Sequence, residues 1–230
     1  YWQLFSTNQY SGADRQMNAN NLTGALTTRL LDDNGVERFS ASFGQIHYFD
    51  PQRVVLPGRK VTDWTGSDYV AQADIQLNDQ WRASTAYQWS PNTRQVDLGT
   101  FQVQRRIKTD GILNFSYRFR RTPGSTNVLL EQYDASTVYP ISDRWRLLGR
   151  WTYSAKDRRT VEALAGVQYE SCCVILSLIG RHYVSPYAPI GSTSKHLPSN
   201  NAVMFELQFK GLGAFNGQAE DFLRRAILGY

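Results

Sequence analysis

The residues best suited to covalent chemistry are two adjacent cysteines, Cys172 and Cys173, and the chain contains no others. A trans peptide holds neighbouring Cα atoms about 3.8 Å apart, whereas a relaxed disulfide prefers about 4.4–6.8 Å. The two thiols are therefore poorly placed to bond each other, and any disulfide would join them to cysteines outside these 230 residues. Such a pair indicates an oxidising compartment and an incomplete protein; the alternative is two reduced, accidental thiols.

The other candidate chemistry is weaker. His47, His182 and His196 are too scattered to suggest a metal site, and we expect neither a metal nor a cofactor. His182 and Ser185 lie near a strand end, where some barrel enzymes carry a hydrolytic site, but a polar side chain facing water is the simpler interpretation. No glycine-rich phosphate loop follows a strand and opens a helix. We therefore predict no catalytic residues.

The cysteines lie in a short polar turn between two predicted strands, and this pattern runs along the whole chain. The predicted strands are 22–31, 37–49, 67–77, 81–89, 95–107, 111–120, 128–140, 145–154, 160–170, 174–184 and 201–211, and residues 1–6 could end a twelfth. Most are close to the ~9–11 residues that a tilted strand needs to cross a bilayer. Short turns alternate with connections that are mostly longer or richer in loop formers, as in outer-membrane barrels.

Side chains alternate between two chemical classes along these segments, most clearly over 145–154. One face carries Trp145, Leu147, Trp151 and Tyr153, and the other carries Arg146, Arg150 and Thr152. An arginine facing lipid at mid-depth costs ~2–4 kcal/mol. The aromatic face is therefore expected to point outward, toward lipid.

Aromatic residues are expected to mark the two edges of the lipid-facing band. Trp81 and Trp89 are eight residues apart. A rise of ~3.4 Å per residue and a tilt near ~40° place them roughly 21 Å apart along the membrane normal, close to the ~25 Å height of the band. We assign Trp81, Trp89, Trp145 and Tyr153 to the aromatic girdles.

The composition agrees with a membrane barrel. Aromatic residues make up 13% of the chain, yet the mean hydropathy is −0.46, and no apolar run approaches the ~18–20 residues of a transmembrane helix. The chain begins at Tyr1, so we expect that a signal peptide was removed or that the sequence was cut from a longer protein. The net charge is +5, but the arginines are spread over strands and loops. An anionic glycolipid is therefore a better partner than nucleic acid.

We predict an all-β fold, namely an antiparallel transmembrane β-barrel. The alternative is a soluble β-sandwich, whose strands also alternate. The strand lengths, the alternation of turns and the lack of a wholly apolar central strand all argue against the sandwich.

Several motifs are specific enough to compare with known families. They occupy residues 36–39, 44–49, 141–145, 201–213 and 223–230, and the most specific is 166–173, which ends in Tyr-x-Ser-Cys-Cys. These residues resemble the C-terminal half of the barrel of the LptD family, the outer-membrane lipopolysaccharide-assembly proteins. The resemblance covers nearly the whole chain.

The resemblance implies a barrel of ~26 strands, of which this chain would form about half. It implies that Cys172 and Cys173 bond cysteines in a missing N-terminal part, and that both lie in the periplasm. It also implies transport of lipopolysaccharide in the outer membrane of a Gram-negative bacterium, with sugars passing through the lumen and lipid A leaving at a lateral seam. The residues assigned to the seam strand are Asn201, Val203, Phe205, Leu207, Phe209 and Gly211.

The implied partners are lipopolysaccharide, an LptE-like lipoprotein plug, a periplasmic bridge protein that docks on the missing domain, the barrel-assembly machinery and outer-membrane lipids. We divide the chain into a barrel part, 1–212, and a periplasmic tail, 213–230, with a short amphipathic helix within 219–228. The rival interpretations are a general outer-membrane channel or receptor barrel and an outer-membrane enzyme.

Overall fold

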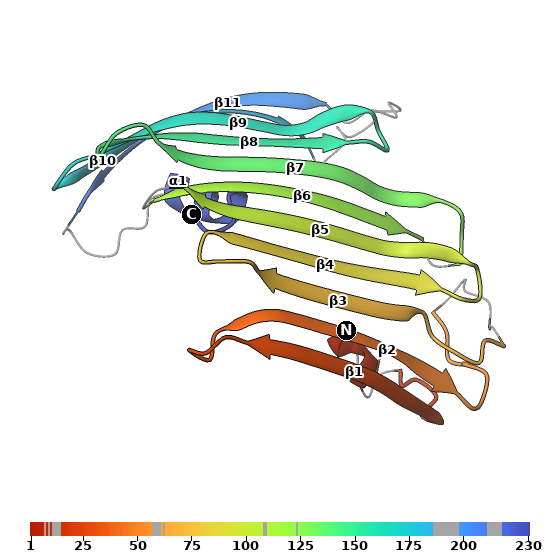
Figure 1. Cartoon of the computed structure of the whole chain (residues 1–230). Coiled ribbons are helices and arrows are strands. Elements are labelled where there is room, and N and C mark those ends of the chain that lie inside the picture. Colours follow the sequence, from red (N-terminus) through yellow and green to blue (C-terminus); the bar gives the residue numbers. More distant parts are fainter. Residues whose placement is uncertain are drawn as a thin grey trace. The chain divides into compact units, whose positions relative to one another are not determined.

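The computed structural model describes residues 1–6, 8, 10, 15–56, 61, 63–107, 110–122, 124–185, 198–210 and 218–230. Its strands are β1 (Asn21–Leu31), β2 (Glu37–Tyr48), β3 (Tyr69–Gln76), β4 (Trp81–Ser90), β5 (Gln95–Ile107), β6 (Gly111–Arg121), β7 (Val128–Pro140), β8 (Trp145–Ser154), β9 (Arg159–Glu170), β10 (Val174–Val184) and β11 (Ser199–Phe209). They form one sheet in which each strand pairs with the next in chain order (Figure 1). A 3-10 helix, η1 (Trp2–Phe5), precedes the strands, and a helix, α1 (Gln218–Ala226), follows them.

The chain divides into two compact units. Unit 1 comprises Tyr1–Asn78, Ala83–Phe101 and Phe119–Leu129; unit 2 comprises Asp79–Arg82, Gln102–Arg118 and Leu130–Tyr230. Unit 1 therefore contains η1 and β1 to β3, and unit 2 contains β8 to β11 and α1. Strands β4 to β7 contribute residues to both units.

The predicted antiparallel sheet is confirmed, and all eleven strand boundaries agree with the prediction within two residues. The helix expected within 219–228 is also present. The connections predicted to be longer lie at the end of the sheet opposite the short turns, and two of them are shorter than predicted. There Arg94 and Arg158, with φ of 55° and 52°, close two tight turns.

The suggestion that residues 1–6 end a twelfth strand is wrong. The Leu4 and Ser6 N–H groups donate back to Tyr1 O and Gln3 O, which curls the chain into η1. The Leu4 side chain is buried. It lies over Gly44 of β2, where an added Cβ would come 2.7 Å from Leu4 Cδ1. This long-range contact has no signature in the short segment itself.

The two faces of the sheet differ in chemistry. On β8, Trp145, Leu147 and Trp151 are exposed, whereas Leu148 and Thr152 are buried. We call the face with the exposed large apolar side chains the outer face and the opposite one the inner face. A soluble protein would hide such apolar side chains from water. The observed arrangement instead fits a wall with lipid on its outer face.

Candidate functional site

Cys172 and Cys173 lie in the turn between β9 and β10, and both are exposed, free thiols. Their sulfur atoms are 2.9 Å apart. The hydrogen bond with Cys172 raises the pKa of the Cys173 thiol above its ordinary value, so less of it is thiolate at neutral pH. Both thiols are open to a cysteine from another part of a larger protein.

The cysteine turn is tied to the end of β11. The Lys210 N–H group donates to Cys173 O at 2.7 Å, and Lys210 Nζ donates to Glu170 at 2.6 Å. Glu170, the last residue of β9, also pairs with Arg146 at 2.9 Å. The turn and the end of β11 are therefore held together by both backbone and side-chain contacts.

β11 is an edge strand. It pairs with β10 along its whole length, from Ser199 opposite Val184 to Phe209 opposite Val174. Among the strands that the structure describes, it is hydrogen-bonded to β10 alone. Of the residues predicted for the seam, β11 carries Asn201, Val203, Phe205, Leu207 and Phe209, and the four apolar ones are exposed; Gly211 lies outside the described residues.

The inner face of unit 2 carries a ladder of alternating charges that crosses four strands. Arg150 of β8 lies 2.9 Å from Asp134 of β7 and 3.2 Å from Glu162 of β9. Glu162 in turn lies 2.6 Å from Arg181 of β10. We call these four residues the charge ladder. Because the signs alternate, each charge has an opposite neighbour, which offsets the cost of withdrawing it from water.

The end of the chain also lies on the inner face of unit 2. Leu223, Ala226 and Ile227 form one buried cluster with side chains of β7 to β10, and Met204 of β11 packs against it. The strand members of this cluster are Val138, Leu148, Leu164 and Ile179. This docking was not predicted from the sequence. The available signal was an apolar residue at an inner position, such as Leu148 beside the outward Leu147.

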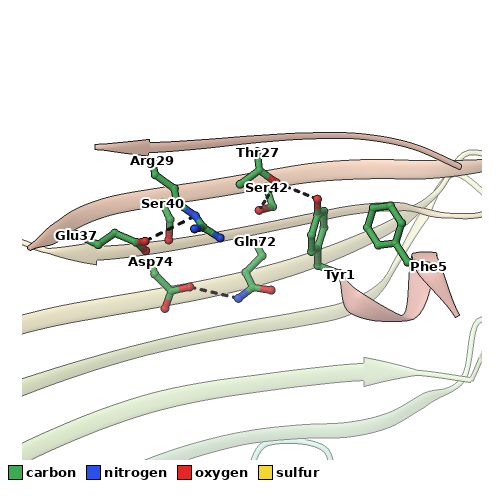
Figure 2. A pocket seen from close by; sticks show the side chains of 9 residues that line it. All are labelled: Tyr1, Phe5, Thr27, Arg29, Glu37, Ser40, Ser42, Gln72 and Asp74. Carbon is green, nitrogen blue, oxygen red and sulfur yellow. Dashed lines mark hydrogen bonds and ion pairs between the residues drawn. The ribbon is translucent and has the colours of Figure 1, made fainter. Parts of the chain in front are cut away.

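A pocket of about 400 Å³ opens on the inner face of unit 1 (Figure 2). Its lining residues are Tyr1, Phe5, Thr27, Arg29, Glu37, Ser40, Ser42, Gln72 and Asp74. Several polar groups pair with one another, as Arg29 with Glu37 at 3.7 Å. Hydroxyl, amide and carboxylate groups around two aromatic rings suit a surface that faces water. None of these residues was predicted as a site.

The four residues predicted for the aromatic girdles all lie on strands. Their ring contacts are Trp145 with Tyr169 at 4.9 Å, Tyr153 with Trp151 at 5.6 Å, Trp89 with Tyr69 at 5.9 Å, and Trp81 with the Arg105 guanidinium at 5.0 Å. Trp81 and Trp145 begin their strands, whereas Trp89 and Tyr153 stand next to last in theirs. Their depth in a bilayer stays a prediction.

His182 lies on β10, with its Nδ1 atom 2.7 Å from Asn201 Oδ1 of β11. The contact joins the edge strand to its neighbour. His196 lies outside the described residues. Within the part of the chain that the structure describes, no group of three or more His, Cys, Asp or Glu side chains could hold a metal ion.

An outer face of exposed apolar side chains and an inner face of paired charges define the wall of an antiparallel transmembrane β-barrel. A family model described as LptD, LPS transport system D, matches residues 1–145. The chain belongs to the LptD family.

Curated relatives match the chain almost end to end. The LPS-assembly protein LptD of Xanthomonas campestris pv. campestris (strain 8004) is 39% identical over 239 residues, which cover 100% of this chain and 29% of the relative. LptD of Nitrosococcus oceani is 39% identical, and the match covers 99% of this chain and 29% of that relative. LptD of Xylella fastidiosa is 38% identical, and the match covers 99% of this chain and 28% of that relative. The chain thus spans less than a third of these relatives.

Among solved structures, the NanC porin in a rhombohedral crystal form is similar, with a TM-score of 0.36 and 14% sequence identity. The match covers 83% of this chain and 94% of the porin.

Proposed function

We propose that the protein containing this chain transports lipopolysaccharide and assembles it in the outer leaflet of the outer membrane. Polar sugars pass along the inner face, and lipid A leaves sideways through a seam at β11. The observation that carries the proposal is that β11, one of the two edge strands of the described sheet, pairs only with β10 among the described strands and exposes apolar side chains along its outer face. An edge of this kind can open where a closed ladder of hydrogen bonds cannot. The name of the relatives, LPS-assembly protein LptD, supports the substrate.

We further propose that Cys172 and Cys173 form disulfides with cysteines outside this chain, in the periplasm. Both thiols are exposed, and a bond between them is disfavoured by the short Cα separation across one peptide. Because Lys210 ties the turn to the end of β11, these disulfides would anchor the seam strand to the domain that supplies their partners.

The proposed partners follow from this role. Lipopolysaccharide would arrive from a periplasmic bridge protein bound to a domain outside this chain, and an LptE-like lipoprotein would occupy the lumen. Leu207 and Phe209, at the end of β11, suit recognition by the barrel-assembly machinery during folding. Residues 1–212 would form barrel wall, with outer-membrane lipids between the aromatic girdles, and 213–230 would be a tail on the periplasmic side whose end, Phe222–Tyr230, packs against the inner face of the wall. We propose no role for nucleic acid and none for catalysis.

A photo-crosslinking phenylalanine analogue at Phe205 tests the seam in the full-length protein. The matched control carries the analogue at Phe115, which is exposed on the outer face of β6. We expect lipopolysaccharide adducts at position 205 that increase while lipopolysaccharide is being delivered, and only a constant background at position 115. Equal adducts at both positions during delivery would exclude a seam at β11 and favour a general channel or receptor barrel.

Substitution of both cysteines tests the disulfides. Full-length protein with Cys172→Ser and Cys173→Ser should migrate on a non-reducing gel as the reduced wild type does, and should lose lipopolysaccharide delivery. Unchanged mobility and unchanged assembly would contradict the disulfide role. The enzyme interpretation makes a different prediction, because it requires an activity that His182→Ala abolishes while the fold is kept.

A further inference from the structure

The segment Phe222–Tyr230 lies against the inner face of unit 2, behind the strands in Figure 1. Its Leu223 and Ile227 side chains are 0% exposed, whereas the adjacent Leu228 is 54% exposed. The wall beneath Leu223 and Ile227 is unusual for an inner face, because it is apolar. A wall that meets only water and sugar has no need of apolar side chains there.

The apolar positions beneath the segment form one continuous row across five strands. Cross-strand pairing places these residues next to one another in the order Val138, Leu148, Gly166, Ile179 and Met204, from β7 to β11. We call them the apolar row. At its centre, a Cβ on Gly166 would lie 2.9 Å from Leu178 O and 3.0 Å from Ile179 Cγ1. The row is therefore closely packed at its middle.

Polar contacts fasten the segment at its two ends. Asn114 of β6 and Gln104 of β5 both donate to Leu228 O, at 2.9 and 3.3 Å. Gln168 of β9 donates to Tyr230 Oη at 2.8 Å. At the start of the segment, the Arg181 guanidinium lies 4.7 Å from the centre of the Phe222 ring. Arg181 also belongs to the charge ladder, so the segment contacts the ladder through this residue.

These contacts together join the segment to every strand from β5 to β11. Gln104 and Asn114 connect it to β5 and β6, the apolar row connects it to β7 through β11, and Met204 is its contact on the edge strand. Strand pairing by itself joins each strand only to its immediate neighbours in the sheet. A segment that touches seven strands restrains their relative movement in a way that strand pairing alone does not.

We propose that Phe222–Tyr230 is a brace that keeps β5 to β11 a single rigid wall while lipopolysaccharide leaves. With the brace in place, the seam opens on the free side of β11, and β11 does not separate from β10. This inference rests on the proposed function, since it assigns a mechanical role during export through that seam.

The test compares Ile227→Asp with Leu228→Asp in the full-length protein. Both place a carboxylate in the brace, one into the buried cluster and the other at an exposed position. Spin labels attached through non-cysteine chemistry at Phe115 of β6 and Val203 of β11 report the distance distribution across the wall. The distribution is measured at rest and during lipopolysaccharide delivery.

We expect a narrow distribution in both conditions for the wild type and for Leu228→Asp. Ile227→Asp should broaden the distribution, most strongly during delivery, and should lose delivery. If Ile227→Asp does not assemble, Ile227→Ala is measured instead and should show a smaller broadening in the same direction. The brace would be overturned if the Ile227 variant that assembles left the distance distribution unchanged. It would also be overturned if Leu228→Asp broadened the distribution as much as the Ile227 variant does.

The outcome is separable from that of the proposed function. If the analogue at Phe205 gives no delivery-dependent adduct in an otherwise wild-type protein, the seam is wrong whatever the spin labels report. If the adduct forms and the Ile227 variants leave the distance distribution unchanged, only the brace is wrong.

Discussion

The helices at the two ends of the chain both lie on the inner face, one in each unit, and they are held differently. In unit 1, among the η1 side chains whose burial the structure describes, Leu4 is the buried one and lies over Gly44, and the Leu4 carbonyl accepts a hydrogen bond from Thr23 at 3.1 Å. In unit 2, Leu223 and Ala226 of α1 and Ile227, which follows it, are buried in a cluster with four strands. The difference shows that a group of apolar side chains on the inner face indicates where another segment of the same chain packs against the strands.

The charges near the two helices differ in the same way. In unit 1, Arg29 and Glu37 are 3.7 Å apart, with 63% and 43% of their side-chain surfaces exposed. In unit 2, Arg150 and Glu162 are 3.2 Å apart, and only 18% and 13% of their side-chain surfaces are exposed. Unit 1 therefore leaves an open polar surface around Tyr1 (Figure 2), whereas unit 2 packs its inner face with its own groups.

The largest effect that separates the two helices is expected from truncation of their buried leucines. Leu223→Ala removes a fully buried side chain from a closed cluster and should lower the free energy of unfolding by about 2–4 kcal/mol. Leu4→Ala should cost about 1–2 kcal/mol, because Leu4 lies over a glycine and lines a second pocket of unit 1, of about 330 Å³, that water can enter. Urea unfolding of the full-length protein in lipid bilayers measures both. Equal costs would mean that η1 is docked as firmly as α1.

A smaller effect is expected at Gly166, at the centre of the apolar row. Gly166→Ala places a methyl group 2.9 Å from the Leu178 carbonyl oxygen, and backbone cannot move aside as a flexible side chain does. We expect a loss of about 1–3 kcal/mol in the free energy of unfolding.

Gly149→Ala is the matched control for that substitution, because a Cβ there meets only Thr137 Cγ2, at 3.4 Å. It should change the free energy of unfolding by no more than about 0.5 kcal/mol. The same bilayer unfolding experiment applies. A loss at position 149 as large as that at 166 would show that the apolar row is not specially close-packed.

The strands could be predicted from the sequence because alternation in a membrane wall is a local signal. On β8, each outward aromatic residue stands next to an inward polar one, and the bounds Trp145–Ser154 are those predicted. The turn around Cys172 could also be predicted from local sequence, since it lies between two such alternating segments. The disulfide partners and the seam stay predictions, because they depend on strands and cysteines outside this chain.

The docking of the tail could not be predicted in the same way. The apolar row exists only when Leu148, Gly166 and Ile179 come into register, and register depends on pairings between distant residues. The charge ladder likewise needs Asp134, Glu162 and the two arginines of neighbouring strands to meet. Inward apolar residues such as Leu148 and Ile179 were visible in the sequence as breaks in the alternation, but nothing local identified what covers them.

The smallest effect concerns the charges, and it sharpens the contrast between the two units. Glu162→Gln removes the carboxylate that pairs with both Arg150 and Arg181, and we expect a loss of about 1–2 kcal/mol in the free energy of unfolding, since two partly buried cations lose a counter-charge. Glu37→Gln should cost less than about 0.5 kcal/mol because its pair with Arg29 is exposed. Unfolding is measured at low and at high salt. Added salt should erase the effect at Glu37 and leave most of that at Glu162, since buried pairs are screened less; a loss at Glu162 that salt also erases would mean that water reaches the charge ladder as freely as it reaches the pocket of unit 1.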